Sequence, residues 1–186
     1  MSRENVEIVR QPIAVRAQSR RHLDERLGLR FPRALALLAR TIWGLPPRSR
    51  LRRWLVSRFA RLGFEALNRG DHEAGLLLFH PDVESTWPPQ LATVGVQTQI
   101  RGREERLRFQ DNWRAEWGGL SFEIEQLFAA EDRVLVLGRT KGSGLSSGVT
   151  AETESAWVFT VSAGKVIRED IFLDHGEARK AAGLSE

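Results

Sequence analysis

The most informative segment for the architecture is Gly164-Lys165-Val166-Ile167-Arg168-Glu169-Asp170-Ile171-Phe172-Leu173-Asp174-His175-Gly176-Glu177-Ala178-Arg179-Lys180-Ala181-Ala182-Gly183-Leu184. Its opening glycine favours a hairpin turn, and the alternating apolar residues that follow predict a half-buried strand. The alanine-rich end predicts a short helix. Asp174 is a good N-cap for that helix, because its carboxylate can accept a backbone N–H.

This strand closes a run of four. Alternation and short turns predict strands at 120–128, 133–141, 149–161 and 165–174, joined as an antiparallel meander. Two earlier strands are predicted at 83–87 and 94–100. Helical spacing predicts helices at 3–10, 19–29, 32–43, 49–68 and 102–117, and a short one at 75–79. Helices first and a meander afterwards is an α+β arrangement.

Three landmarks occur in a familiar order. A helix ends in Ala66-Leu67-Asn68-Arg69-Gly70-Asp71, a strand opens His80-Pro81-Asp82-Val83-Glu84, and the strand and helix quoted above come last. This order resembles the SnoaL-like family of the nuclear-transport-factor-2-like (NTF2-like) superfamily. The resemblance implies an NTF2-like cone, in which a curved antiparallel sheet wraps around helices and encloses a pocket.

The same resemblance divides the chain. We assign residues 63–186 to the SnoaL-like domain and residues 1–62 to an Arg-rich helical N-terminal region. Residues 3–11 resemble the start of the family's first helix. Residues from about 12 to 57 are therefore interpreted as an insertion that is continuous with that helix.

The charge is distributed unevenly. Residues 12–70 hold 14 arginines and 3 acidic residues, whereas residues 71–186 hold 12 basic and 19 acidic residues. Clustered arginine can bind nucleic acid or an anionic lipid surface. It can equally coat helices and pair with the acidic half of the chain, and we favour that interpretation. Nucleic acid and anionic surfaces remain possible partners that are not favoured.

Composition also bears on location. The chain has no cysteine, its N-terminus lacks the apolar core of a signal peptide, and its longest apolar run, 34–45, is interrupted by Arg40. That run is short of the roughly 20 residues that a membrane-spanning helix needs. We therefore predict a cytoplasmic protein without a transmembrane segment.

Two charged residues lie on strand faces that are otherwise apolar. Alternation places Glu169 beside Ile167 and Ile171, and places Arg139 beside Leu135 and Leu137. A charge on an apolar face is costly unless it is paired or solvated. The pair is thus either a catalytic carboxylate with an arginine clamp in the pocket, or a structural ion pair, or the product of a register shift.

Large aromatic residues could line the pocket. We predict ligand contacts from Trp87, Phe109, Trp113, Trp157 and Ile171, although aromatic residues in a small domain are more often core. The histidines lack metal-ligand spacing, so no metal site is predicted.

Known chemistries of the superfamily give a further test. Ketosteroid isomerase-like members use aspartates and a tyrosine; the base position matches Ser85, and the chain has no tyrosine. Limonene-epoxide-hydrolase-like members use an Asp-Arg-Asp set, of which only the arginine is matched, by Arg139. The resemblance therefore implies a cofactor-free isomerase, cyclase or hydrolase for a polyketide- or terpenoid-like compound, with Glu169 as acid or base.

Two function classes follow. The first is a protein that binds a small apolar ligand in an aromatic-lined pocket, as a homodimer assembled through the sheet. The alternative is a non-catalytic interaction module whose Arg-rich helices bind protein, nucleic acid or an acidic membrane surface.

Overall fold

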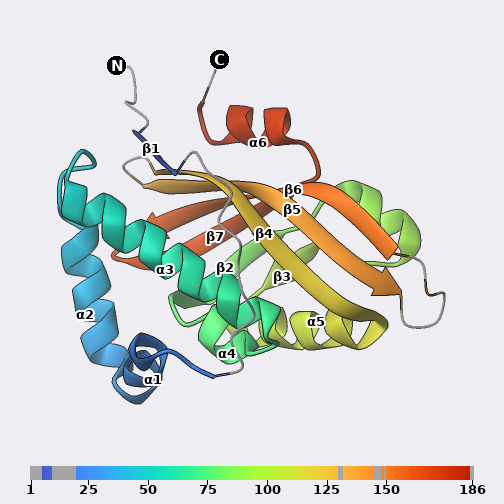
Figure 1. Cartoon of the computed structure of the whole chain (residues 1–186), viewed down its shortest axis with the longest axis horizontal. Coiled ribbons are helices and arrows are strands. Elements are labelled where there is room, and N and C mark those ends of the chain that lie inside the picture. The colour runs from blue at the N-terminus through green and yellow to red at the C-terminus, as the bar shows by residue number, and fades with distance from the viewer. Residues whose placement is uncertain (1–5, 10–19, 130–131, 145–147, 149, 185–186) are drawn as a thin grey trace.

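The molecule is built on one seven-stranded sheet, seen in a computed structural model that describes residues 6–9, 20–129, 132–144, 148 and 150–184. The strand order is β1-β4-β5-β6-β7-β2-β3 (Figure 1). The strands are β1 (Val6–Val9), β2 (Phe79–Thr86), β3 (Gln99–Arg101), β4 (Trp117–Ala129), β5 (Arg133–Gly144), β6 (Thr150–Ser162) and β7 (Lys165–Phe172). All neighbours are antiparallel except β2 and β7, which are parallel. The predicted α+β fold and the antiparallel meander β4–β7 are confirmed.

Helices are started by local caps. They are α1 (Leu23–Arg30), α2 (Pro32–Trp43), α3 (Arg50–Asn68), α4 (His72–Gly75), α5 (Arg103–Glu116) and α6 (His175–Ala181), with a 3-10 helix at Pro89–Val94. Pro32 occupies the first turn of α2, where its missing N–H is not needed. The side chain of Ser49 accepts the N–H of Arg52 at the start of α3. Asp174 accepts the N–H of Glu177 at 2.7 Å, which confirms its role as a cap.

Both faces of the sheet are covered. On the concave face, α3 and α5 pack against a core that includes Phe64, Phe122 and Trp157. On the opposite face, α6 covers a smaller cluster around Leu135, Leu137 and Ala178 (Figure 1). The central strands are therefore buried on two sides.

Two predicted helices are wrong. Residues 6–9 form strand β1, because the β-branched Val6, Ile8 and Val9 can pair with the free edge of β4. The short helix expected at 75–79 lies earlier, at α4. Phe79 instead opens β2 by pairing with Val166 of β7.

The N-terminal helices pack on the cone. Gly164, in the turn between β6 and β7, has φ +79°, and a Cβ there would lie 2.5 Å from the carbonyl carbon of Ala39 in α2 and overlap the backbone of Arg40. Only glycine permits this close approach. None of the helices in the described part of the chain is long and apolar enough to cross a membrane.

Ion pairs hold α1 against the end of α3. Glu25 binds Arg69 at 2.6 Å, and both side chains are buried. Arg21 binds Asp71 at 2.6 Å. Burial raises the pKa of Asp71, but hydrogen bonds from Arg21 and the N–H of Ala74 outweigh it, so that pKa is below its ordinary value. These contacts fix α1 beside the end of α3.

Candidate functional site

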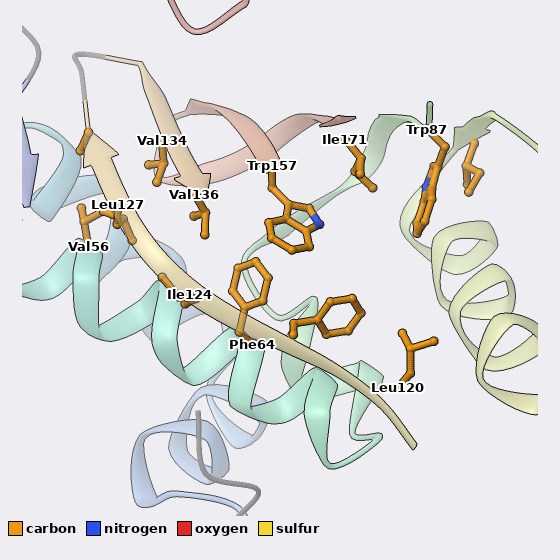
Figure 2. Packing of buried hydrophobic residues seen from close by; sticks show 13 residues of the cluster. Val56, Phe64, Trp87, Leu120, Ile124, Leu127, Val134, Val136, Trp157 and Ile171 are labelled. Carbon is orange, nitrogen blue, oxygen red and sulfur yellow. The ribbon is translucent and has the colours of Figure 1, made fainter. Parts of the chain in front are cut away.

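An apolar cavity of about 150 Å³ lies between the helices and the concave face of the sheet. An apolar cavity of that size holds a molecule about as large as benzene. Its sheet side is formed by Phe122, Val134, Trp157, Phe159 and Val161. Figure 2 shows how Trp157 of β6 meets Phe64 of α3, whose ring centroids are 4.8 Å apart.

The Arg-rich N-terminal region supplies the opposite wall. Leu35, Ala39, Ile42 and Trp43 reach the cavity from α2, and Asp24 and Glu25 reach it from α1. The four α2 residues reach the cavity together because positions 35, 39, 42 and 43 lie on one face of the helix. The extra helices therefore form part of the cavity.

A buried polar cluster borders the cavity, which Glu169, Arg106 and Gln110 line. Glu169 of β7 is 3% exposed and binds Arg106 of α5, which is 2% exposed. Arg106 Nε donates to Glu169 Oε2 at 2.7 Å, and its second amino group donates to Oε1 at 3.3 Å. Ser85 Oγ donates to the same Oε2 at 2.8 Å, and Gln110 Oε1 accepts from Arg106 at 2.5 Å. The bidentate pair and its two neighbours compensate the cost of burying both charges.

Trp87 lies beside this cluster and lines the cavity. The guanidinium of Arg106 lies 5.2 Å from the centre of the Trp87 ring, within cation–π range. The indole N–H of Trp87 is buried and has no hydrogen-bond partner among the described residues, and the same holds for Trp43. Buried N–H groups are normally bonded, so these two are exceptions to the usual pairing.

Arg139 does not share the cavity with Glu169, so the interpretation of these two residues as a pair in the pocket is wrong. Glu169 is paired with Phe159, which is paired with Val134, and all three face inward. Arg139 is five residues from Val134 on an unbroken strand pairing, so it faces the other way. It is exposed and binds Glu125 at 2.7 Å and Glu152 at 3.1 Å. Hydrogen bonds to these two carboxylates raise the pKa of Arg139.

The predicted pocket residues divide into two groups. Trp87 and Trp157 line the cavity. Phe109, Trp113 and Ile171 lie in the core around them; Phe109 contacts Trp87 with a centroid distance of 4.7 Å and stacks on Trp113 at 5.9 Å. Of these residues, Figure 2 labels Trp87, Trp157 and Ile171.

The partner of Glu169 could have been found from helical spacing. Arg106 comes three residues before Phe109 and four before Gln110, so it lies on the inward stripe of α5 together with the aromatic ridge. Most other positions of α5 are charged or polar, which makes its inward stripe hard to recognise from the sequence. Ser85 matches the base position of ketosteroid isomerase-like members in the sequence. In the structure it contacts the carboxylate of Glu169 on β7.

Other titratable residues are bound elsewhere. His72 Nδ1 lies 2.5 Å from Asp111 Oδ1, and His175 Nε2 lies 3.0 Å from the carbonyl oxygen of Gly138. Within the described ranges, no group of three or more potential ligand residues could hold a metal ion.

Comparison with known proteins gives a consistent result. A model of the SnoaL-like domain matches residues 60–169. An NTF2-like protein of unknown function from Burkholderia pseudomallei K96243 is 20% identical over 67% of this chain and 94% of its own, with a TM-score of 0.59. TerC, co-crystallised with polyporic acid, is 23% identical over 65% and 92% of the two chains, with a TM-score of 0.55.

A proposed SnoaL-like polyketide cyclase from Jannaschia sp. CCS1 is 20% identical over 70% of this chain and 90% of its own, with a TM-score of 0.52. At these identities the likeness concerns the fold alone. No curated protein matches the chain.

Proposed function

Because the chain belongs to the SnoaL-like domain family, we propose that it binds a small, largely apolar carbonyl compound in the cavity between α2, α3 and the sheet. The observation that carries this proposal is the buried cluster of Glu169, Arg106 and Ser85 beside a predominantly apolar cavity. A polar group that is placed in this way orients a ligand whose remaining surface is apolar.

The cavity limits the ligand. Its volume fits a one-ring compound, so a polyketide- or terpenoid-like ligand would be a monocyclic one. The buried N–H of Trp87 has no partner among the described residues, and we propose that a small rotation of the ring on binding lets it donate to a ligand acceptor such as a carbonyl oxygen. Trp43 offers a second donor on the α2 side.

The geometry also supports proton transfer. Glu169 would remove a proton from the carbon beside the carbonyl group; the C–H electron pair would pass into an enolate, and the negative charge would move from Glu169 to the ligand oxygen. Arg106 stays beside both positions and Trp87 donates to the oxygen, so the charge remains compensated throughout. Return of the proton to a different carbon isomerises the compound. This step requires no cofactor.

Binding can be tested with two probes of one shape. Acetophenone and isopropylbenzene differ chiefly in the carbonyl oxygen. We expect acetophenone to bind more tightly in calorimetry, and Trp87→Phe to remove most of that difference while it leaves isopropylbenzene binding nearly unchanged. Trp113→Phe is the matched control, because Trp113 lies in the core outside the cavity lining. Equal binding of both probes by the wild-type protein would contradict the assigned acceptor site.

Proton transfer has a separate readout. In D₂O, the methyl group of acetophenone should take up deuterium faster with the wild-type protein than with Glu169→Gln, followed by NMR. General-base catalysis is typically worth about 10²–10⁴-fold. Binding without accelerated exchange would leave a ligand-binding protein and remove the catalytic role of Glu169.

We also propose that the protein acts in the cytoplasm as a homodimer assembled through the outer face of the sheet. The outer face carries opposite charges side by side, such as Lys141 between Glu123 and Glu152 at 3.4 and 3.5 Å, so two copies could complement each other. Light scattering coupled to size-exclusion chromatography should give twice the chain mass. A monomer at all concentrations would refute this assembly.

A further inference from the structure

The exposed large apolar side chains gather in one part of the molecule. In the described ranges, seven of the eight belong to residues 23–54; these are Leu23, Leu27, Phe31, Leu37, Leu38, Leu51 and Trp54, with exposures of 49–68%. The eighth is Ile167 of β7, at 37%. Six of them belong to α1, α2 and the first half of α3, and Phe31 joins α1 to α2; these elements lie together at one end of the fold (Figure 1).

Leu37 shows that this exposure is not merely a displaced part of the core. In α2, Ile42 is 4% exposed and faces the cavity, whereas Leu37, on the opposite side of the same helix, is 68% exposed. The helix is therefore apolar both toward the cone and away from it. A surface helix that only packs on the cone would carry polar residues on its outer side.

The same helices carry a strong positive charge. Exposed arginines on or between them include Arg26, Arg30, Arg33, Arg40, Arg48 and Arg50. From residue 20 to residue 64 the only acidic residues are Asp24 and Glu25. Both are already bound, Asp24 to Arg58 at 2.5 Å and Glu25 to Arg69 at 2.6 Å. This surface is consequently basic as well as apolar.

That combination selects among partners. A nucleic acid would use the arginines but gain little from exposed leucines. A second copy would cover the leucines but place two equally basic surfaces against each other. An anionic lipid bilayer satisfies both features, because arginines bind lipid phosphates while leucine, phenylalanine and tryptophan enter the boundary between headgroups and acyl chains.

We propose that α1, α2 and the first half of α3 form a docking surface for anionic membranes, on which the protein lies peripherally. Leu23, Leu27, Phe31, Leu37, Leu38, Leu51 and Trp54 enter the interface, and the surrounding arginines bind the phosphates. Docking is independent of the ligand chemistry proposed above, since none of these seven side chains lines the cavity.

Vesicle flotation of the full chain tests this surface. We expect binding to vesicles of phosphatidylcholine mixed with phosphatidylglycerol, weak binding to phosphatidylcholine alone, and a decrease in affinity as sodium chloride is raised. Leu37→Gln with Leu38→Gln should weaken binding roughly tenfold. Ile167→Gln is the matched control, as an exposed apolar residue outside the surface.

Charge is tested separately. Arg33→Gln with Arg40→Gln should weaken binding by about fivefold per arginine. Arg101→Gln, whose side chain is 80% exposed on β3, should leave the affinity unchanged. Circular dichroism and thermal unfolding of each variant show that the fold is retained.

Several results would overturn the proposal. One is equal binding to neutral and anionic vesicles; another is unchanged binding by both double variants with the fold intact. DNA binding that survives Leu37→Gln with Leu38→Gln, in the absence of vesicle binding, would identify a nucleic-acid surface instead. A dimer that these two substitutions disperse would identify a second copy as the partner.

Discussion

The Nε atom of Arg106 lies 2.7 Å from Oε2 of Glu169, and the two side chains are 2% and 4% exposed. An ion pair buried this deeply contributes little net stability, because desolvation offsets the attraction. Loss of one partner is different, since it leaves an uncompensated charge. The free energy of unfolding should therefore fall when either Arg106 or Glu169 alone is substituted.

Arg106→Met should destabilise the protein by about 3–5 kcal/mol, because it leaves the Glu169 carboxylate buried with only Ser85 as a partner. Urea unfolding measures this change. Arg139→Met is the matched control: its ion pairs are exposed, and we expect no resolvable change in the unfolding midpoint.

Combining Arg106→Met with Glu169→Leu should cost much less than the sum of the two single substitutions, because an apolar pair replaces the ions. Additive effects in this double-mutant cycle would mean that the two side chains do not interact in solution.

Gly138→Ala should destabilise the sheet by about 3 kcal/mol, at the upper end of the range for overpacking. A Cβ at position 138 would overlap the carbonyl oxygen of Glu123 in β4, so backbone rather than a side chain would have to move. Gly142→Ala, on the same strand, meets only side-chain atoms of Leu120 and Trp117 at 3.4 Å and should be tolerated better. Thermal unfolding of both variants provides the comparison; equal midpoints would contradict the close approach of β4 and β5.

Asp71 should make the ion pair between the segment before α1 and the start of α4 sensitive to acid. Its folded-state pKa is below the unfolded value of about 3.9, so its contribution is complete above that value and is lost as pH falls through the folded pKa. The stability difference between the wild-type protein and Asp71→Asn should therefore be constant near neutral pH and shrink below about pH 4. Arg21→Met should reduce this acid dependence, because Arg21 is the partner. Urea unfolding between pH 7 and pH 2 measures these differences. A stability difference between the wild-type protein and Asp71→Asn that does not change with pH would refute the lowered pKa of Asp71.

Much of the fold could be predicted from local sequence. Pro32 and Gly44 bracket α2, and the helix has the predicted bounds. Alternation placed Glu169 and Ile171 on one face of β7, and the paired strands confirm that this face is directed inward. Strand β1 was missed because four residues with helical or extended potential adopt a strand only through the edge of β4.

The error over Arg139 has a physical cause. Val134, Leu135, Val136 and Leu137 are all buried, because the concave face packs on α3 and the opposite face packs on α6. An apolar face on such a strand does not identify the cavity side. Leu135 and Leu137 lie beneath α6, and Arg139 continues that outer face. Only the strand register, which links Glu169 through Phe159 to Val134, distinguishes the two sides.

The Arg-rich region should behave as part of the cone rather than as a detachable arm. Ile42 of α2 is 4% exposed and lines the cavity, so Ile42→Ala removes buried apolar surface and enlarges the cavity. We expect a loss of about 2–5 kcal/mol in the free energy of unfolding, together with tolerance of a larger ligand, for example propiophenone in place of acetophenone. Leu37→Ala on the same helix is the matched control, because Leu37 is 68% exposed and its truncation should change stability little. Urea unfolding and calorimetry measure the two effects, and equal costs at positions 42 and 37 would show that α2 does not pack on the sheet in solution.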